Sequence, residues 1–69
     1  MKDSVVIFGP AACGKTRNAK LIAEHLGLPY IHDGGPEGAP AKGALILSNV
    51  EEPGALDYFD VMREIKETL

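Results

Sequence analysis

A pair of glycines between an apolar run and an amphipathic stretch constrains this sequence more than any other feature. Gly9 and Gly14 enclose four residues, and Lys15-Thr16 follow directly, which gives the spacing Gly-x-x-x-x-Gly-Lys-Thr. Residues 5–8 in front are apolar and β-branched, as expected of a short buried strand. Residues 15–26 behind have helical periodicity. The sequence therefore predicts a strand, a tight loop and a helix in direct succession.

The spacing of this loop, the Walker A motif, suits the binding of phosphate groups. Gly9 permits a turn that a side chain would obstruct, and Gly14 allows the backbone to approach phosphate oxygens. Successive N–H groups then form an anion-binding concavity at the positive end of the helix. Lys15 is the expected catalytic cation on the β- and γ-phosphates, and the Thr16 hydroxyl is an expected Mg²⁺ ligand. The full predicted phosphate-binding set is Gly9, Pro10, Ala11, Ala12, Cys13, Gly14, Lys15, Thr16 and Arg17. The alternative is a chance glycine-rich turn.

Length and cysteine content limit the architecture. The 69 residues allow one small domain, over 1–69, whose core alone rarely supplies more than roughly 3–5 kcal/mol. Cys13 is the single cysteine, so no internal disulfide can form, and two histidines with one cysteine make no convincing zinc site. Further stabilisation is therefore expected from a ligand or from self-association, such as a homo-oligomer.

The charge and hydropathy patterns exclude other classes. The formal net charge is −3, with both signs mixed along the chain, which disfavours a nucleic-acid surface built on a basic patch. No apolar run approaches the ~18 residues of a membrane span, and the N-terminus lacks the pattern of a signal peptide. We therefore expect a cytoplasmic protein without a membrane partner.

The remaining chain predicts two further strands and one helix. A second strand is expected over 28–32, a Gly- and Pro-rich loop over 33–43 and a third, central strand over 44–48. After a turn over 48–54, a helix is expected from Pro53 or Ala55 to the end of the chain. Its predicted buried stripe is Ala55, Phe59, Met62, Ile65 and Leu69, with Tyr58 beside it. In the first helix the corresponding stripe is Ala19, Ile22, Ala23 and Leu26.

These elements predict a small α/β fold with a three-stranded sheet and two helices. The direction of the third strand is the open point, because parallel strands need a crossover and 33–43 shows no helix. Eleven extended residues span about 36 Å, which is enough to cross back over a short strand. A parallel third strand is predicted, with a hairpin-like antiparallel strand as its rival.

Residues 4–33 resemble the first unit of P-loop NTPases, and in detail the small-molecule kinases of the shikimate-kinase type. That resemblance implies a role for Asp33 on Mg²⁺ or substrate, as a metal-binding and catalytic residue. Residues 44–49 resemble instead the sensor-1 strand of AAA+ ATPases, which implies that Asn49 contacts the γ-phosphate. In both families the later strand inserts beside the P-loop strand, so the implied sheet order is first, third, second. Asp33 and Asn49 could alternatively serve only in turns.

The sequence departs from both families where hydrolysis would be assisted. Ser48-Asn49 stand where a Walker B motif places Asp, and neither a base nor a lid domain is visible. The expected function is thus binding of a Mg-nucleoside triphosphate, ATP by family resemblance, with weak or no hydrolysis, so that enzyme status stays open. One alternative is a small-molecule phosphotransferase that uses Asp33. Another is a degenerate, non-enzymatic module that binds a protein partner.

Overall fold

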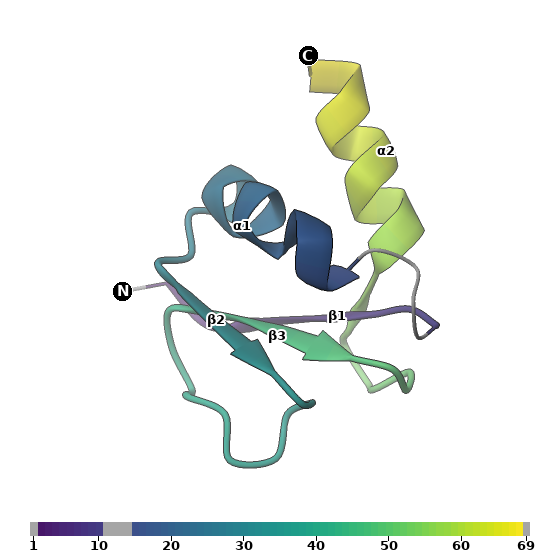
Figure 1. Cartoon of the computed structure of the whole chain (residues 1–69). Coiled ribbons are helices and arrows are strands. Elements are labelled where there is room, and N and C mark those ends of the chain that lie inside the picture. Colours follow the sequence, from purple (N-terminus) through teal and green to yellow (C-terminus); the bar gives the residue numbers. More distant parts are fainter. Residues whose placement is uncertain (1, 11–14, 69) are drawn as a thin grey trace.

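Four parallel strands form one sheet, and two helices cover one of its faces (Figure 1). The computed structural model describes residues 2–10 and 15–68, with side chains of the second range from Arg17 onward. The elements are β1 (Val5–Phe8), α1 (Lys15–Leu26), β2 (Tyr30–Asp33), β3 (Ala44–Ser48), β4 (Leu56–Asp57) and α2 (Tyr58–Thr68). The strand order is β2-β3-β1-β4, and each neighbouring pair is parallel.

The core lies between the helices and the sheet. Ile7, Leu45 and Leu47 point from β1 and β3 into it and are at most 2% exposed. The predicted stripe of α1 is confirmed, since its first three residues are buried and Leu26 packs against the cluster. Spacing at three and four residues brings these side chains onto one face of the helix, where burial stabilises it.

Gly27 ends α1 as its position predicts. It has φ +74°, a conformation that glycine adopts without steric cost. Its N–H donates to the Glu24 carbonyl (3.2 Å) and the Leu28 N–H to the Ala23 carbonyl (2.8 Å), which is the Schellman pattern. Leu28 is consequently buried under α1, and β2 begins at Tyr30 rather than at Leu28 as predicted.

The third strand is parallel, and it is central, as predicted. All of β3 is buried, between β2 and β1. The predicted order of first, third and second strand is therefore confirmed for these three. The helix-free connection 34–43 returns over the sheet face opposite the helices (Figure 1). Its end is fixed to the N-terminal segment, because the Ser4 N–H donates to the Ala41 carbonyl (3.1 Å) and the Gly43 N–H to the Lys2 carbonyl (2.7 Å).

The prediction of three strands is wrong, because the chain adds β4 on the free side of β1. Leu56 pairs with Ile7, and Asp57 pairs with Phe8. A turn precedes this strand: the Ala55 N–H donates to the Glu52 carbonyl (3.0 Å), and Gly54 has φ +80°. Pro followed by Gly at the two central positions is typical of a type II turn. The proline therefore begins a turn here and not a helix.

The start and the buried face of the last helix also differ from the prediction. The Phe59 N–H donates to the Asp57 carboxylate (2.8 Å), so Asp57 caps a helix that begins at Tyr58. Tyr58, Val61 and Ile65 are buried and Met62 packs against them, whereas Phe59 is 56% exposed. Ala55 precedes the helix, and Leu69 lies outside the described residues. Pairing of β4 with β1 fixes the direction in which α2 leaves the sheet, and this sets its rotation.

Neither described helix is long and apolar enough to pass through a bilayer.

Candidate functional site

The Gly-x-x-x-x-Gly-Lys-Thr segment leaves the sheet at the carboxyl end of β1, beside the end of β3. Phe8 and Ser48 are register partners, and the Gly9 N–H donates to the Ser48 carbonyl (3.2 Å). Gly9 is buried there and Pro10 is exposed. The chain resumes as α1 at Lys15, as the motif predicts. Ligands of open α/β sheets gather at this carboxyl edge.

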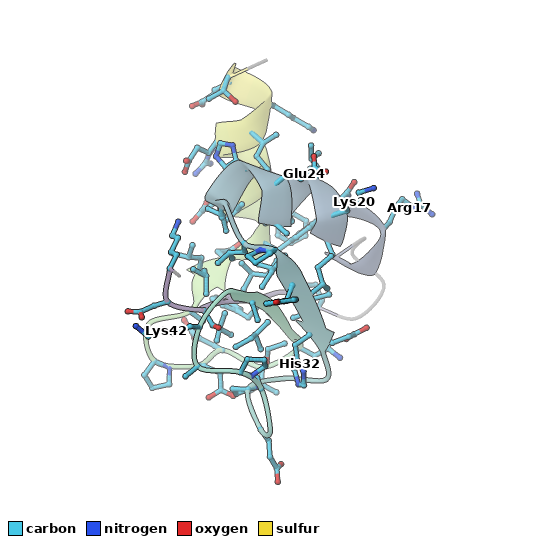
Figure 2. All side chains as sticks on the ribbon, turned by 90° about the vertical axis from the view of Figure 1, so that its left-hand side faces the viewer. Arg17, Lys20, Glu24, His32 and Lys42 are labelled. Carbon is cyan, nitrogen blue, oxygen red and sulfur yellow. The ribbon has the colours of Figure 1, made fainter. Side chains whose placement is uncertain are left out.

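Much of the predicted phosphate-binding set lies outside the described residues. This applies to Ala11, Ala12, Cys13 and Gly14, and to the side chains of Lys15 and Thr16. Their roles stay predictions. Arg17 is exposed in the first turn of α1 (Figure 2). Of the predicted set, the structure therefore places Gly9, Pro10 and Arg17 at the two ends of the segment.

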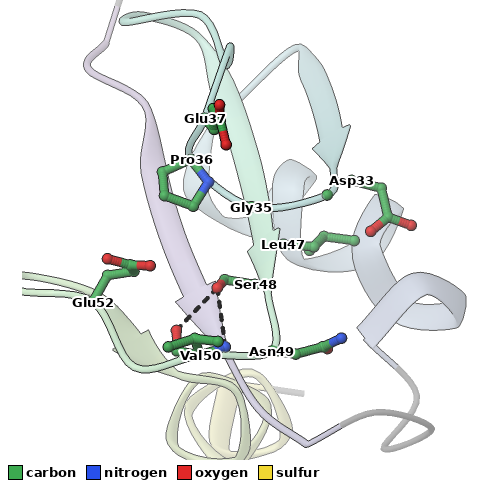
Figure 3. Close-up of a pocket in the computed structure, with 10 residues that line it drawn as sticks. Asp33, Gly35, Pro36, Glu37, Leu47, Ser48, Asn49, Val50 and Glu52 are labelled. Carbon is green, nitrogen blue, oxygen red and sulfur yellow. Dashed lines mark hydrogen bonds between the residues drawn. The ribbon is translucent and has the colours of Figure 1, made fainter.

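Asn49 lies next to the start of this segment. It follows Ser48, whose carbonyl accepts the Gly9 N–H, and its own position is exposed. In the close-up its amide extends away from Pro36 and Glu52 (Figure 3). The register of β1 and β3 thus brings Asn49 and the beginning of the motif together, although they are 40 positions apart in the sequence.

Asp33 is one strand further away. It ends β2 and pairs with Leu47, so β3 lies between it and β1, which separates the two strands by about 10 Å. Leu47 belongs to the core under the helices, and register neighbours in a parallel pair share a face, so Asp33 projects on the helical side. Among the described residues, no group of three His, Cys, Asp or Glu side chains is arranged to hold a metal ion.

Ser48 has a structural role that the sequence reasoning did not identify. Its hydroxyl donates to the Val50 carbonyl (2.9 Å) and accepts from the Val50 N–H (3.1 Å), which fixes the turn after β3. The side chain is 5% exposed. Serine two residues before the N–H that it binds is the pattern of an ST turn, so the signal was present in the sequence. This hydroxyl therefore serves the backbone of its own turn.

An open cleft of about 420 Å³ lies beside the ends of β2 and β3 (Figure 3). The segments that follow these two strands form its walls, and the Gly35 N–H donates to the Leu47 carbonyl (2.8 Å) to hold the first wall in place. The lining residues are Asp33, Gly34, Gly35, Pro36, Glu37, Leu47, Ser48, Asn49, Val50 and Glu52. The sequence predicts Asp33 and Asn49 as site residues but gives no sign of the cleft, because the walls of the cleft come from segments without periodicity.

The cleft is acidic. Its described lining includes the acidic residues Asp33, Glu37 and Glu52 and no lysine, arginine or histidine. Like charges in a partly enclosed site repel an anion. The cleft therefore suits a neutral or cationic group, whereas the motif between β1 and α1 predicts an anion site. Asn49 lines the cleft and follows Ser48, whose carbonyl accepts the Gly9 N–H.

The fold and the motif define a small parallel α/β protein whose Gly-x-x-x-x-Gly-Lys-Thr segment begins at the carboxyl edge of the sheet. The chain is similar to RuvB, a Holliday junction branch migration complex subunit from Streptococcus equi subsp. zooepidemicus (strain MGCS10565), with 33% identity over 67 residues. The match covers 97% of this chain and 20% of that protein. The chain thus spans about one fifth of the length of this relative. No protein-family profile matches the chain, and no solved structure matches it either.

Proposed function

We propose that this chain binds the phosphates of a Mg-nucleoside triphosphate, ATP by family resemblance, at the segment that joins β1 to α1. Backbone N–H groups of residues 11–15 and the Lys15 ammonium would hold the phosphates, and Thr16 would supply a hydroxyl to Mg²⁺. Asn49 would approach the γ-phosphate from the end of β3. The residues present thus offer both anion-binding groups and an oxygen ligand for the metal.

The observation that supports this proposal is the position at which β1 ends and α1 begins. β1 ends at Phe8 and α1 begins at Lys15, so the glycine-bracketed segment connects an inner strand of the sheet to a helix N-terminus. The mechanism of the motif requires this context, because the amide groups must converge at the positive end of a helix. The parallel sheet adds support, since it directs the segment to the edge where such ligands bind.

Similarity to RuvB supports nucleotide binding in a P-loop context, because the alignment runs through both the motif and the strands around it. Branch migration and membership of its complex are properties of the whole relative, of which the match covers one fifth.

We expect hydrolysis to be slow. Phosphoryl transfer depends on metal, positioning and charge stabilisation, and P-loop NTPases hold their metal with an aspartate after a core strand. Here Ser48 occupies that strand end, and its hydroxyl is bonded to Val50. Thr16 and the phosphates would then bind Mg²⁺ without that carboxylate. The chain is better suited to bind a nucleotide than to turn it over.

Thermal unfolding with and without Mg-ATP tests the proposal. At a ligand concentration of 100 times the dissociation constant, the folded state should gain about 2.7 kcal/mol, a large fraction of the stability of so small a domain. Lys15→Ala should abolish most of this gain. Lys66→Ala, in the last turn of α2, is the matched control and should retain it. A gain that persists unchanged in Lys15→Ala would contradict the assigned site, and no gain with any nucleotide or pyrophosphate would favour a non-enzymatic module.

The cleft favours one second candidate, a small-molecule phosphotransferase in which Asp33 orients the acceptor. The acidic lining predicts a neutral or cationic acceptor. Transfer to such an acceptor, measured as ADP formation above the rate of free phosphate release, should depend on Asp33. Asp33→Asn should lower transfer and leave the stabilisation by Mg-ATP in place. Equal transfer rates for wild type and Asp33→Asn would contradict the role of this residue.

A further inference from the structure

The sheet ends in an open edge at β2. This strand pairs with β3 on one side, and no other described strand lies beyond it. Two large apolar side chains are exposed there, Tyr30 at 55% and Ile31 at 47%. The edge also carries no lysine or proline within the strand, although such residues are common protection against strand pairing. The opposite edge, β4, is only two residues long.

The register of β2 assigns its side chains to the two faces. Ile31 pairs with Leu45 and Asp33 with Leu47, both in the core under the helices. Ile31 and Asp33 therefore lie on the helical face of the edge, whereas Tyr30 and His32 lie on the face opposite the helices, because residues alternate along a strand. This assignment limits which residues could meet across a joined edge.

Above the edge, α1 presents charges of both signs in a defined order. Figure 2 views the molecule from this side and shows Arg17, Lys20 and Glu24 along α1 above β2. All three are exposed. The N-terminal part of this row is basic and the C-terminal part is acidic. Two such rows that run antiparallel would bring unlike charges together.

We propose that β2 pairs with β2 of a second copy of this chain, antiparallel, about a twofold axis normal to the sheet. Such an axis keeps the helical faces of both copies on the same side, so each residue must pair with a residue on the same face of the sheet. An axis that passes midway between Ile31 and the second Ile31 fulfils this condition. It pairs Ile31 with the second Ile31 and Tyr30 with the second His32. The joined sheet has eight strands, and the two α1 helices flank the junction.

The occupant is a second copy because the surface is complementary to itself. The twofold axis places the apolar Ile31 against its equivalent, which removes both side chains from water. It also places the aromatic ring of Tyr30 against an imidazole, a cross-strand pair that stabilises antiparallel sheets. Finally, it directs Lys20 of one α1 toward Glu24 of the other. A four-residue strand makes a small interface, so the dimer is weak and depends on concentration.

Sedimentation equilibrium of the chain over a wide concentration range tests the dimer. The average mass should rise from 7.3 kDa toward twice that value. Ile31→Lys places like charges opposite each other and should raise the dissociation constant about tenfold or more. Leu21→Lys is the matched control, since Leu21 is similarly exposed (42%) but lies on α1, and it should dimerise as wild type. Far-UV circular dichroism verifies that both variants fold.

A charge exchange tests the orientation of the two copies. Lys20→Glu should weaken dimerisation by about threefold at low salt, and Lys20→Glu with Glu24→Lys should restore it, because the order of charges is then reversed in both copies. A chain that stays at 7.3 kDa at every concentration overturns the proposal. So does a folded Ile31→Lys variant that dimerises as wild type. A double variant no better than Lys20→Glu overturns the antiparallel arrangement.

Discussion

The two faces of the sheet are stabilised in different ways. On the helical face, Ile7, Leu45 and Leu47 pack against buried side chains of α1 and α2. On the opposite face, the segments 34–43 and 49–55 cover the sheet without any helix (Figure 1). They are held by individual hydrogen bonds, several of which involve serine hydroxyls. The first face depends on apolar area, and the second depends on donors and acceptors in fixed positions.

This difference separates stability from function. Apolar packing leaves little space between side chains, whereas hydrogen-bonded loops leave room between them, and the loop residues 34–37, Asn49, Val50 and Glu52 line much of the cleft. The helical face therefore supports the sheet that positions the carboxyl edge. The loop face shapes what can reach that edge. The effects of substitutions on stability should accordingly differ between the two faces, both in magnitude and in physical cause.

The largest loss is expected from Leu45→Ala on the helical face. Leu45 is fully buried, and truncation of a core leucine costs about 2–5 kcal/mol, comparable with the whole stability of a domain of this size. Urea unfolding, followed by circular dichroism in a stabilising osmolyte, measures the loss. Ile46→Ala, the next residue on the same strand, is the control. It faces the loops, which can collapse into the space, so its loss should be smaller. Equal losses would contradict the distinction between the faces.

A smaller loss is expected from Ser48→Ala on the loop face. This change removes both hydrogen bonds to Val50 and leaves its N–H and carbonyl without that partner in a partly buried turn, which costs about 1–3 kcal/mol. The same unfolding assay measures it. Thr68→Ala removes one hydroxyl bond, to the Ile65 carbonyl at the end of α2, and should cost less. If Ser48→Ala loses no more stability than Thr68→Ala, the turn after β3 is stable without the Ser48 hydroxyl.

Ser4→Ala should cost about 1 kcal/mol, because the hydroxyl joins two segments of the loop face. It donates to the Pro40 carbonyl (2.8 Å) and accepts from the Ala44 N–H (3.0 Å). Native-state hydrogen exchange should show the Ala44 amide exchanging about fivefold faster. The amide of Ile22, in the core of α1, serves as the internal reference. Unchanged exchange at Ala44 would show that the hydroxyl does not secure this connection.

The sequence predicted α1 and β3 of the helical face well because their signals are periodic or continuous. The stripe of α1, the glycine at its end and the apolar third strand each follow from side-chain spacing or from backbone conformation. The connection 33–43 is long enough for a parallel β3, which was the predicted direction, with an antiparallel strand as its rival. The start of α1 at Lys15 agrees with what the motif predicts, and the register of β1 and β3 brings Asn49 close to Gly9. These features are local, or depend on one register.

The remaining features depend on contacts between distant segments. β4 has two residues and no pattern of its own, and it exists because Leu56 and Asp57 meet the end of β1. The Pro53-Gly54 turn was a readable signal for an interruption, but the apolar spacing beyond it favoured a longer helix. The exposed Phe59 shows the consequence, since the buried face of α2 runs through Tyr58, Val61 and Ile65 and is offset from the predicted stripe. The cleft was missed for a related reason, because two aperiodic segments form its walls.

The smallest effect is expected from Lys42→Ala, although Lys42 makes the ion pair of the loop face. Its ammonium lies 3.7 Å from the Asp3 carboxylate, and both side chains are largely exposed, at 65% and 86%. Exposed pairs contribute about 0–1 kcal/mol, and salt screens them. The backbone bonds of the neighbouring residues Ala41 and Gly43 to the N-terminal segment remain in the variant. The free energy of unfolding should therefore change by less than about 0.5 kcal/mol, at low and at high salt. A loss as large as that of Ser4→Ala would show that charge, and not the hydroxyl and backbone bonds, holds this face together.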